Sequence, residues 1–155
     1  MHAVDWVAFA FSTWFGLGLS PIVPTLAAVF SILPVYCAFG QRPPIFWPFT
    51  LGIILVGWWA SYQSERSTGI ADDGRIVVDE VAGAALLLTF VRPRDHWQII
   101  LPLIGYLVVD GIKPWPMSAM EALPGAYGVM GDDLVIAVLV GAFLVPMRVW
   151  QARRN

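Results

Sequence analysis

The chain has little charge, a single cysteine and a single lysine among its 155 residues. Charged residues make up 13% of the sequence, whereas soluble domains carry about 25%. The one cysteine, Cys37, excludes an intrachain disulfide. A formal net charge of −2 leaves no basic stripe of the kind that nucleic acid binding requires. These shortages exclude an ordinary soluble domain, a disulfide scaffold and a nucleic-acid-binding protein.

Apolar residues, by contrast, are abundant. They make up 58% of the chain, and the mean hydropathy is +0.71. Several of the eight tryptophans stand at the ends of apolar runs, which is typical of residues at a membrane–water interface. No cleavable signal peptide is expected, because the N-terminus lacks a basic region and the first apolar stretch contains Asp5. The composition therefore predicts a membrane protein.

The apolar runs predict the fold. A short opening run, Val4–Leu19, contains Asp5 and several small residues, so we expect a short interfacial or re-entrant helix there. Five longer runs follow, each near the ~17–25 residues that a membrane-spanning helix needs: Thr25–Gly40, Ile45–Tyr62, Ile76–Val91, Trp97–Ile112 and Asp133–Trp150. The predicted fold is an all-α, polytopic helical membrane bundle of about five spans, in a single domain that covers residues 1–155.

The predicted spans place nearly all acidic side chains on one side of the membrane. If the linkers alternate between the two sides, ten of the eleven carboxylates fall on the side that holds Gln63–Glu80 and Asp110–Asp133. Carboxylates beside hydrocarbon cost about 2.5–3.5 kcal/mol at a helix centre, so they usually mark function. Six arginines fall on the opposite side, and the positive-inside rule alone would put those arginines in the cytoplasm.

The segment from Asp72 to Gly83 contains the first candidate site. Asp72-Asp73-Gly74 reads as a solvated turn, but Asp79 and Glu80 stand between three apolar residues and an apolar helix. Oxygen ligands of this kind hold Mg²⁺, usually with substrate phosphate and water. Gly83 lies one turn beyond Asp79 and would allow a neighbouring element to approach closely. The segment predicts a metal site.

Lys113 lies three residues after Asp110 in the string Asp110-Gly111-Ile112-Lys113-Pro114-Trp115-Pro116. One interpretation is a helix end, with a cation near the negative pole of the dipole and prolines that stop the helix. The other places Asp110 on a metal or water and Lys113 on phosphate. Spacing alone does not separate the two.

Two further segments carry candidate residues. One is the glycine-rich segment Gly125-Ala126-Tyr127-Gly128-Val129-Met130-Gly131, whose N–H groups could turn towards an anion before Asp132 and Asp133. A flexible loop with an aspartate cap is the alternative, but a cap accounts for only one of the two aspartates, so the pattern favours function. Ser20-Pro21-Ile22-Val23-Pro24-Thr25 offers hydroxyls beside rigid prolines, but such hydroxyls usually cap helices.

At these four segments the chain resembles the phosphatidylglycerophosphatase A family of bacterial membrane lipid phosphatases. The matching strings occur in the family's order and are Gly18 to Pro24, Asp72 to Gly83, Asp110 to Pro116 and Gly128 to Asp133. The resemblance implies a Mg²⁺-dependent phosphatase that converts phosphatidylglycerophosphate, a phospholipid of the bilayer, to phosphatidylglycerol. It also implies a multi-pass protein of the bacterial inner membrane with a cytoplasmic active face, against the arginine count.

The chain departs from the family's pattern in its basic and glycine-rich parts. Thr25-Leu26 follows Pro24 where the family has a Gly-Thr-x-Gly-Ser stretch, and Leu107 stands where an arginine is common. Ser118 replaces a second arginine, and a Gly-Gly-x-Gly loop is reduced to Gly125-Ala126-Tyr127-Gly128. The acidic half of the expected site is intact, while the basic half is thinned to Lys113 with Arg75 as a possible helper.

The expected site then has three groups of residues. Metal ligands are Asp72, Asp79, Glu80, Asp132 and Asp133; catalytic residues are Asp79, Glu80, Asp110 and Lys113; and substrate-binding residues are Ser20, Thr25, Arg75, Lys113 and Gly128. Two alternatives remain open. One is a catalytically degenerate member that binds metal or lipid headgroup without turnover, and the other is a small proton-coupled transporter that uses the same acids.

Overall fold

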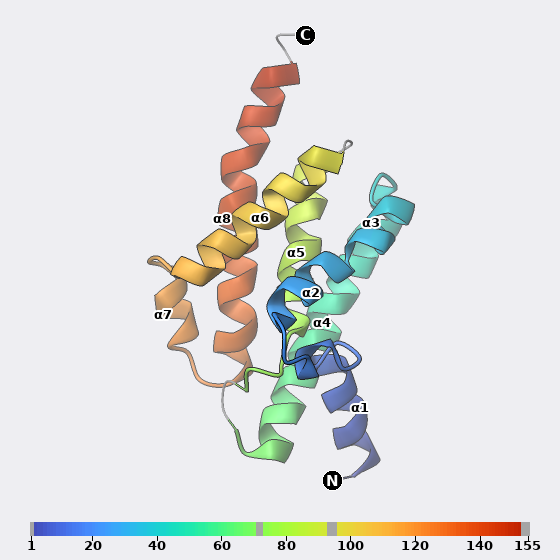
Figure 1. Cartoon of the computed structure of the whole chain (residues 1–155), viewed down its shortest axis with the longest axis vertical. Helices are drawn as coiled ribbons and strands as arrows, with labels where there is room; N and C mark the ends of the chain where they lie inside the picture. Colours follow the sequence, from blue (N-terminus) through green and yellow to red (C-terminus); the bar gives the residue numbers. More distant parts are fainter. Residues whose placement is uncertain (1, 71–72, 93–95, 153–155) are drawn as a thin grey trace.

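The computed structural model describes residues 2–70, 73–92 and 96–152, and within them every regular element is a helix. The elements are α1 (Ala3–Ser12), the 3₁₀ turn η1 (Leu17–Leu19), α2 (Pro24–Ser31), α3 (Leu33–Phe39), α4 (Pro43–Thr68), α5 (Val78–Val91), α6 (His96–Ile112), α7 (Met117–Glu121) and α8 (Ala126–Ala152). They form one elongated bundle, with the N-terminus and the C-terminus at opposite ends (Figure 1). The all-α prediction is confirmed.

Two of the described helices are long and apolar enough to cross a membrane. They are α4 and the Ala126–Pro146 part of α8. The other predicted spans form shorter helices, because Pro34 lacks an N–H and ends α2 near Ser31, and α5 has 14 residues, or about 21 Å of helix. The expected count of about five spans therefore stays a prediction.

Helix α5 occupies the centre of the bundle. It lies between α4 and α8, and α6 crosses it obliquely (Figure 1). Of its 14 residues, 12 are buried, which explains why its sequence is apolar on all sides. The interior of the bundle is formed by side chains such as Val81, Leu88, Leu103 and Ile136, each with no exposed surface. A functional group on α5 is therefore enclosed by its neighbours.

The first turn of α5 is fixed by the N-terminal region. The Val77 N–H donates to the Ser12 carbonyl over 2.9 Å, which joins the beginning of α5 to the end of α1. Gly18 packs directly on the backbone carbonyl of Arg75, where a Cβ would overlap the oxygen. Helix α1 is in turn held to α4, because the Ser12 and Ser64 hydroxyls are 2.8 Å apart. With ten residues α1 is the short helix that the sequence predicts.

Helix α8 begins earlier than expected. The glycine-rich segment that the sequence marks as a loop forms its first two turns, with the Gly128 N–H donating to the Gly125 carbonyl over 2.9 Å. Close packing with α7 explains this, since a Cβ on Gly131 would stand only 3.1 Å from the Met120 Cε. Asp132 and Asp133 consequently lie inside a helix and not at its cap.

Candidate active site

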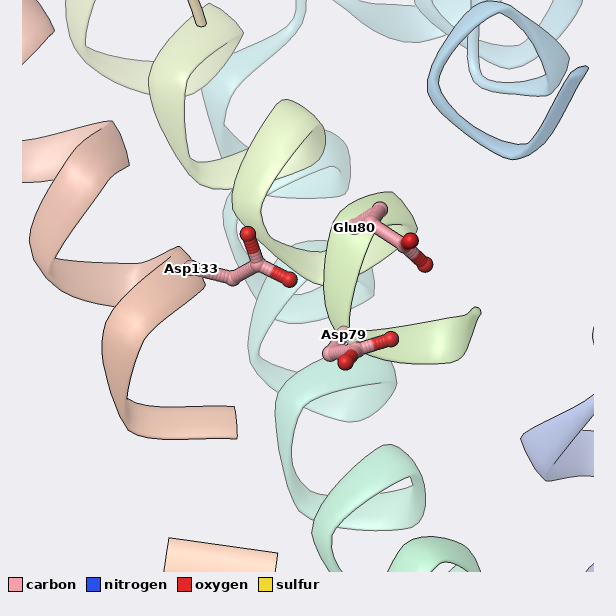
Figure 2. Close-up of side chains that lie close together, drawn as sticks. All are labelled: Asp79, Glu80 and Asp133. Atoms are coloured by element: carbon pink, nitrogen blue, oxygen red, sulfur yellow. The ribbon is translucent and has the colours of Figure 1, made fainter. Parts of the chain in front are cut away.

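Three acidic side chains from two helices meet at the beginning of α5. Asp79 and Glu80 stand in the first turn of α5, and Asp133 extends from α8 (Figure 2). One carboxylate oxygen of each lies within 4.8 Å of the other two. The packing of α5 against α8 brings together residues that are more than 50 positions apart in the sequence.

The three carboxylates line a cavity of about 430 Å³. The described residues that line it include seven carboxylates and one lysine: Glu65, Asp73, Asp79, Glu80, Asp110, Asp132, Asp133 and Lys113. Thr25 and Gly128 also reach the cavity. So many acidic groups around one small volume repel one another when ionised, and a bound cation would relieve that repulsion.

Each of three carboxylates is held by a donor from another helix. The Thr25 hydroxyl in α2 donates to Glu80 Oε1 over 2.9 Å, and the Tyr106 hydroxyl in α6 donates to Asp133 Oδ1 over 2.5 Å. Lys113 Nζ, just beyond α6, donates to Asp132 Oδ2 over 2.9 Å. Charge-assisted hydrogen bonds of this kind are the strong ones, so the acids are fixed in position before any ligand arrives.

Two oxygens of the cluster have no hydrogen-bond donor. Asp79 Oδ1 and Glu80 Oε2 are buried and unpartnered, while the two residues are only 8% and 9% exposed. A buried polar group left unsatisfied costs roughly 1–3 kcal/mol, more when it is charged. The positive end of the α5 dipole offsets part of this cost, because both residues lie in the first turn. A bound cation would satisfy both oxygens.

The donor set fits a hard divalent cation. Three carboxylates supply oxygen alone, and oxygen ligands suit Mg²⁺, Ca²⁺ and Mn²⁺ rather than the softer metals that prefer sulfur or imidazole. The cluster is thus compatible with a divalent metal, in agreement with the metal expected at Asp79, Glu80 and Asp133. Asp132 is oriented differently, towards Lys113.

Several expected residues lie elsewhere. Arg75 forms a bidentate pair with Asp73, with Nη2 2.5 Å from Oδ2, and it is not among the described residues that line the cavity. These hydrogen bonds from the Arg75 side chain lower the pKa of Asp73. Ser20 also stands apart from the cavity, and its hydroxyl donates to the Ile22 carbonyl. Asp72 lies outside the described residues.

The structure adds residues that the sequence reasoning missed. Glu65 and Asp73 line the cavity, and Tyr106 contacts Asp133. Tyr106 could have been found, because it precedes Asp110 by four positions and so shares one face of α6 with it. Nothing in the sequence indicates that this face of α6 meets α8.

Comparison with known proteins gives a consistent result. The family model for Phosphatidylglycerophosphatase A matches residues 10–148. The Phosphatidylglycerophosphatase A of Escherichia coli is 29% identical, and the match covers 84% of this chain and 77% of that protein. The Phosphatidylglycerophosphatase A of Haemophilus influenzae is 30% identical, and the match covers 68% of this chain and 66% of that protein. A Bacteroides thetaiotaomicron protein named "Putative phosphatidylinositol-3-phosphatase" is 30% identical, and the match covers 89% of this chain and 91% of that protein. No solved structure matches significantly.

Proposed function

This chain belongs to the phosphatidylglycerophosphatase A family of phosphoric monoester hydrolases, and from that premise we propose that it is a Mg²⁺-dependent lipid phosphatase. Its substrate is phosphatidylglycerophosphate, and its products are phosphatidylglycerol and phosphate. The observation that carries the proposal is the buried cluster of Asp79, Glu80 and Asp133, which has two unpartnered oxygens and opens into an acidic cavity.

Asp79, Glu80 and Asp133 hold the cation in this proposal. When bound, Mg²⁺ supplies Lewis-acid polarisation of a phosphoryl oxygen and neutralises part of the charge of the phosphate. The three residues are suited to this because their oxygens are already gathered within 4.8 Å. Asp132 stands beside them and orients Lys113. Asp72, which the sequence suggests as a further ligand, lies outside the described residues.

Lys113 and Asp110 act on the substrate. An ammonium group has three N–H donors, so Lys113 can hold Asp132 and a phosphate oxygen at the same time. It stabilises the charge that develops on the phosphoryl group during transfer. Asp110 lines the same cavity and accepts a proton from the attacking water. The water oxygen forms a bond to phosphorus as the bond between phosphorus and the glycerol oxygen breaks, and the glycerol oxygen takes up the proton that Asp110 accepted.

The bilayer completes the substrate site. Large apolar side chains are exposed on the outer surface of the long helices, including Leu51 and Leu55 on α4 and Phe143 on α8, and Leu101 is exposed on α6. Lipid would cover such side chains, which leaves the cavity to capture only the headgroup. We propose a multi-pass location in the bacterial inner membrane, with the cavity open to the cytoplasm.

The test is phosphate release from phosphatidylglycerophosphate in detergent micelles, with Mg²⁺ and with chelator. The expected result is Mg²⁺-dependent release that falls at least ~100-fold in Asp79→Asn. Asp5→Asn is the matched control, because Asp5 accepts a hydrogen bond from Gln63 at 2.9 Å and is not among the described lining residues. Release by Asp79→Asn at the rate of the parent would overturn the proposal.

A second candidate is a member that binds Mg²⁺ or a lipid headgroup without turnover. The observation that favours it is the shortage of positive charge, because Lys113 is the only cation among the described lining residues and is already paired with Asp132. Mg²⁺-dependent thermal stabilisation that Asp79→Asn abolishes, without release from any phosphomonoester lipid, would support it. The panel should include phosphatidylinositol-3-phosphate, in view of the name that the Bacteroides relative carries.

A further inference from the structure

Tyr106 is the one fully buried tyrosine whose hydroxyl reaches the acidic cluster in the described part of the chain. The side chain has no exposed surface, and its hydroxyl donates to Asp133 Oδ1 over 2.5 Å. Asp133 itself is only 3% exposed. Apolar packing would be served equally well by phenylalanine, so the hydroxyl needs an explanation of its own.

The hydroxyl reaches Asp133 by passing over α5 at a glycine. A Cβ on Gly83 would overlap the oxygen and the adjoining ring carbons of Tyr106. Gly83 lies one turn beyond Asp79, at the place where the sequence predicts a close approach. The element that approaches is therefore α6, and the missing side chain of Gly83 leaves room for the Tyr106 ring between α5 and α8.

The contact restrains the carboxylate of Asp133. Tyr106 donates to Oδ1, and one carboxylate oxygen of Asp133 lies within 4.8 Å of an oxygen of Asp79 and of an oxygen of Glu80. The same arrangement holds at Glu80, where Thr25 occupies Oε1 and Oε2 is unpartnered. A carboxylate that can rotate loses entropy when it binds a metal, whereas one held by a hydrogen bond does not.

We propose that Tyr106 is a positioning residue, which orients Asp133 for a divalent cation through its hydroxyl. The inference rests on the proposed metal-dependent phosphatase. Lys113, directly after the end of α6, donates to the neighbouring Asp132. Helix α6 and the residue that follows it thus hold both acids of α8, and Tyr106 acts without contact to substrate.

The test compares Tyr106→Phe with the parent protein in detergent, using Mn²⁺ as the probe and electron paramagnetic resonance to measure the free ion. Removing a partner of a metal ligand typically weakens metal affinity by about 10–100-fold, and we expect a loss in that range. The apo protein should keep its Tm within a few degrees, because the ring still fills its site. In the release assay, the Mg²⁺ concentration for half-maximal rate should rise while the KM for lipid stays constant.

Two further variants separate orientation from packing. Tyr36→Phe is the matched control, because Tyr36 in α3 is also a buried tyrosine, 2% exposed, with a hydrogen-bonded hydroxyl. That hydroxyl accepts a hydrogen bond from the Gln41 side chain at 3.1 Å. It should bind Mn²⁺ as the parent does. Gly83→Ala should weaken Mn²⁺ binding even though the hydroxyl is retained, because the added methyl group displaces the ring.

The outcomes distinguish this inference from the function on which it rests. If the parent binds Mn²⁺ and the affinity of Tyr106→Phe is within two-fold of it, the positioning role is overturned and the phosphatase proposal is not. An equal loss in Tyr36→Phe would do the same, because the effect would then be general. A parent that binds no Mn²⁺ would overturn the metal site and this inference with it, and phosphate release by the parent would then show whether the phosphatase proposal survives.

Discussion

Thr25 and Glu80, 55 positions apart in the sequence, are joined by a hydrogen bond of 2.9 Å from the threonine hydroxyl to Oε1. This bond connects the first turn of α2 to the acidic cluster. A hydroxyl has one proton to donate, so Thr25 cannot donate to a phosphate while it holds Glu80. The hydroxyl that the sequence assigns to substrate binding therefore orients an acid in the structure, and its two lone pairs are left to accept from other donors.

The first prediction concerns this hydroxyl. Thr25→Val removes the hydroxyl and keeps the shape of the side chain, and Glu80 then loses the side-chain donor that α2 supplies. We expect a fall of about 10-fold in metal affinity and in Mg²⁺-dependent phosphate release, the lower end of the range for partners of metal ligands. Mn²⁺ titration and the release assay measure both. Thr25→Ser keeps the hydroxyl and should stay near the parent, and an equal loss in both variants would contradict the prediction.

The second prediction separates stability from catalysis at Lys113. Lys113→Ala leaves Asp132, which is 4% exposed, without its ion-pair partner at 2.9 Å. We expect a loss of about 1–3 kcal/mol in the free energy of unfolding, together with a fall of at least ~10-fold in kcat/KM. The measurements are denaturant unfolding in detergent and steady-state phosphate release.

The double variant Lys113→Ala with Asp132→Asn tests the cause of each effect. It should recover much of the stability, because the buried carboxylate charge is gone, but none of the activity. If the double variant were as unstable as Lys113→Ala, the ion pair would not be the source of the lost stability. If it regained activity, Lys113 would have no role on the substrate.

The third prediction concerns acid stability. Hydrogen bonds from the Arg75 side chain lower the pKa of Asp73, so the folded protein binds this proton less readily than the unfolded chain. The stabilisation is fully present above the unfolded pKa of about 3.9 and is lost as the pH falls through the folded pKa. Asp73→Asn should therefore have a lower Tm than the parent at pH 7, and the difference should shrink as the pH falls below the unfolded pKa of about 3.9.

The expected difference at pH 7 is small, below about 4 °C, because the Arg75 side chain is 43% exposed and solvent screens the pair. Thermal unfolding of both proteins from pH 3 to pH 7 measures it. Arg75→Gln should reproduce the effect, since it removes the other partner. A Tm difference that grows towards low pH would have the wrong sign.

Much of the fold and half of the site follow from the sequence. Apolar runs predict the helices. The position of Asp79 and Glu80 at the start of an apolar run predicts that both acids belong to a functional site. The sequence cannot tell which of two adjacent acids, Asp132 or Asp133, faces α5, because that depends on the rotation of α8. The expected segment boundary at Asp133 failed because tertiary packing of α7 against Gly131 makes a helix of a glycine-rich segment.

The residues that the sequence missed share one physical cause. Tyr106 and Glu65 lie on helices whose role becomes visible only when α4, α6 and α8 are packed around α5. The sequence offers Arg75 as a phosphate contact, but in the structure a short turn at residues 73–76 brings its guanidinium onto Asp73, two residues earlier. Local pattern identifies the chemistry of a residue, whereas long-range packing decides which group it meets.

The last prediction concerns Gly18, which supports the entrance to α5. A Cβ there would overlap the Arg75 carbonyl oxygen, and backbone on both sides leaves nothing flexible to move aside. We expect Gly18→Ala to destabilise the protein by about 2–3 kcal/mol. It should also lower phosphate release more than the remaining folded fraction explains, since the displaced segment leads directly to Asp79. Unfolding and release measured on the same preparation test both parts.

Gly52→Ala is the matched control for this prediction. Gly52 lies inside α4 with no atom within 4 Å of an added Cβ, and alanine in a helix interior is favoured over glycine by about 0.5–1 kcal/mol. The same substitution should therefore have opposite signs at the two positions. A Gly18→Ala variant that unfolds like Gly52→Ala would show that η1 can withdraw from the 73–77 segment at little cost, and that contacts other than that of Gly18 hold the beginning of α5, such as the hydrogen bond from Val77 to Ser12.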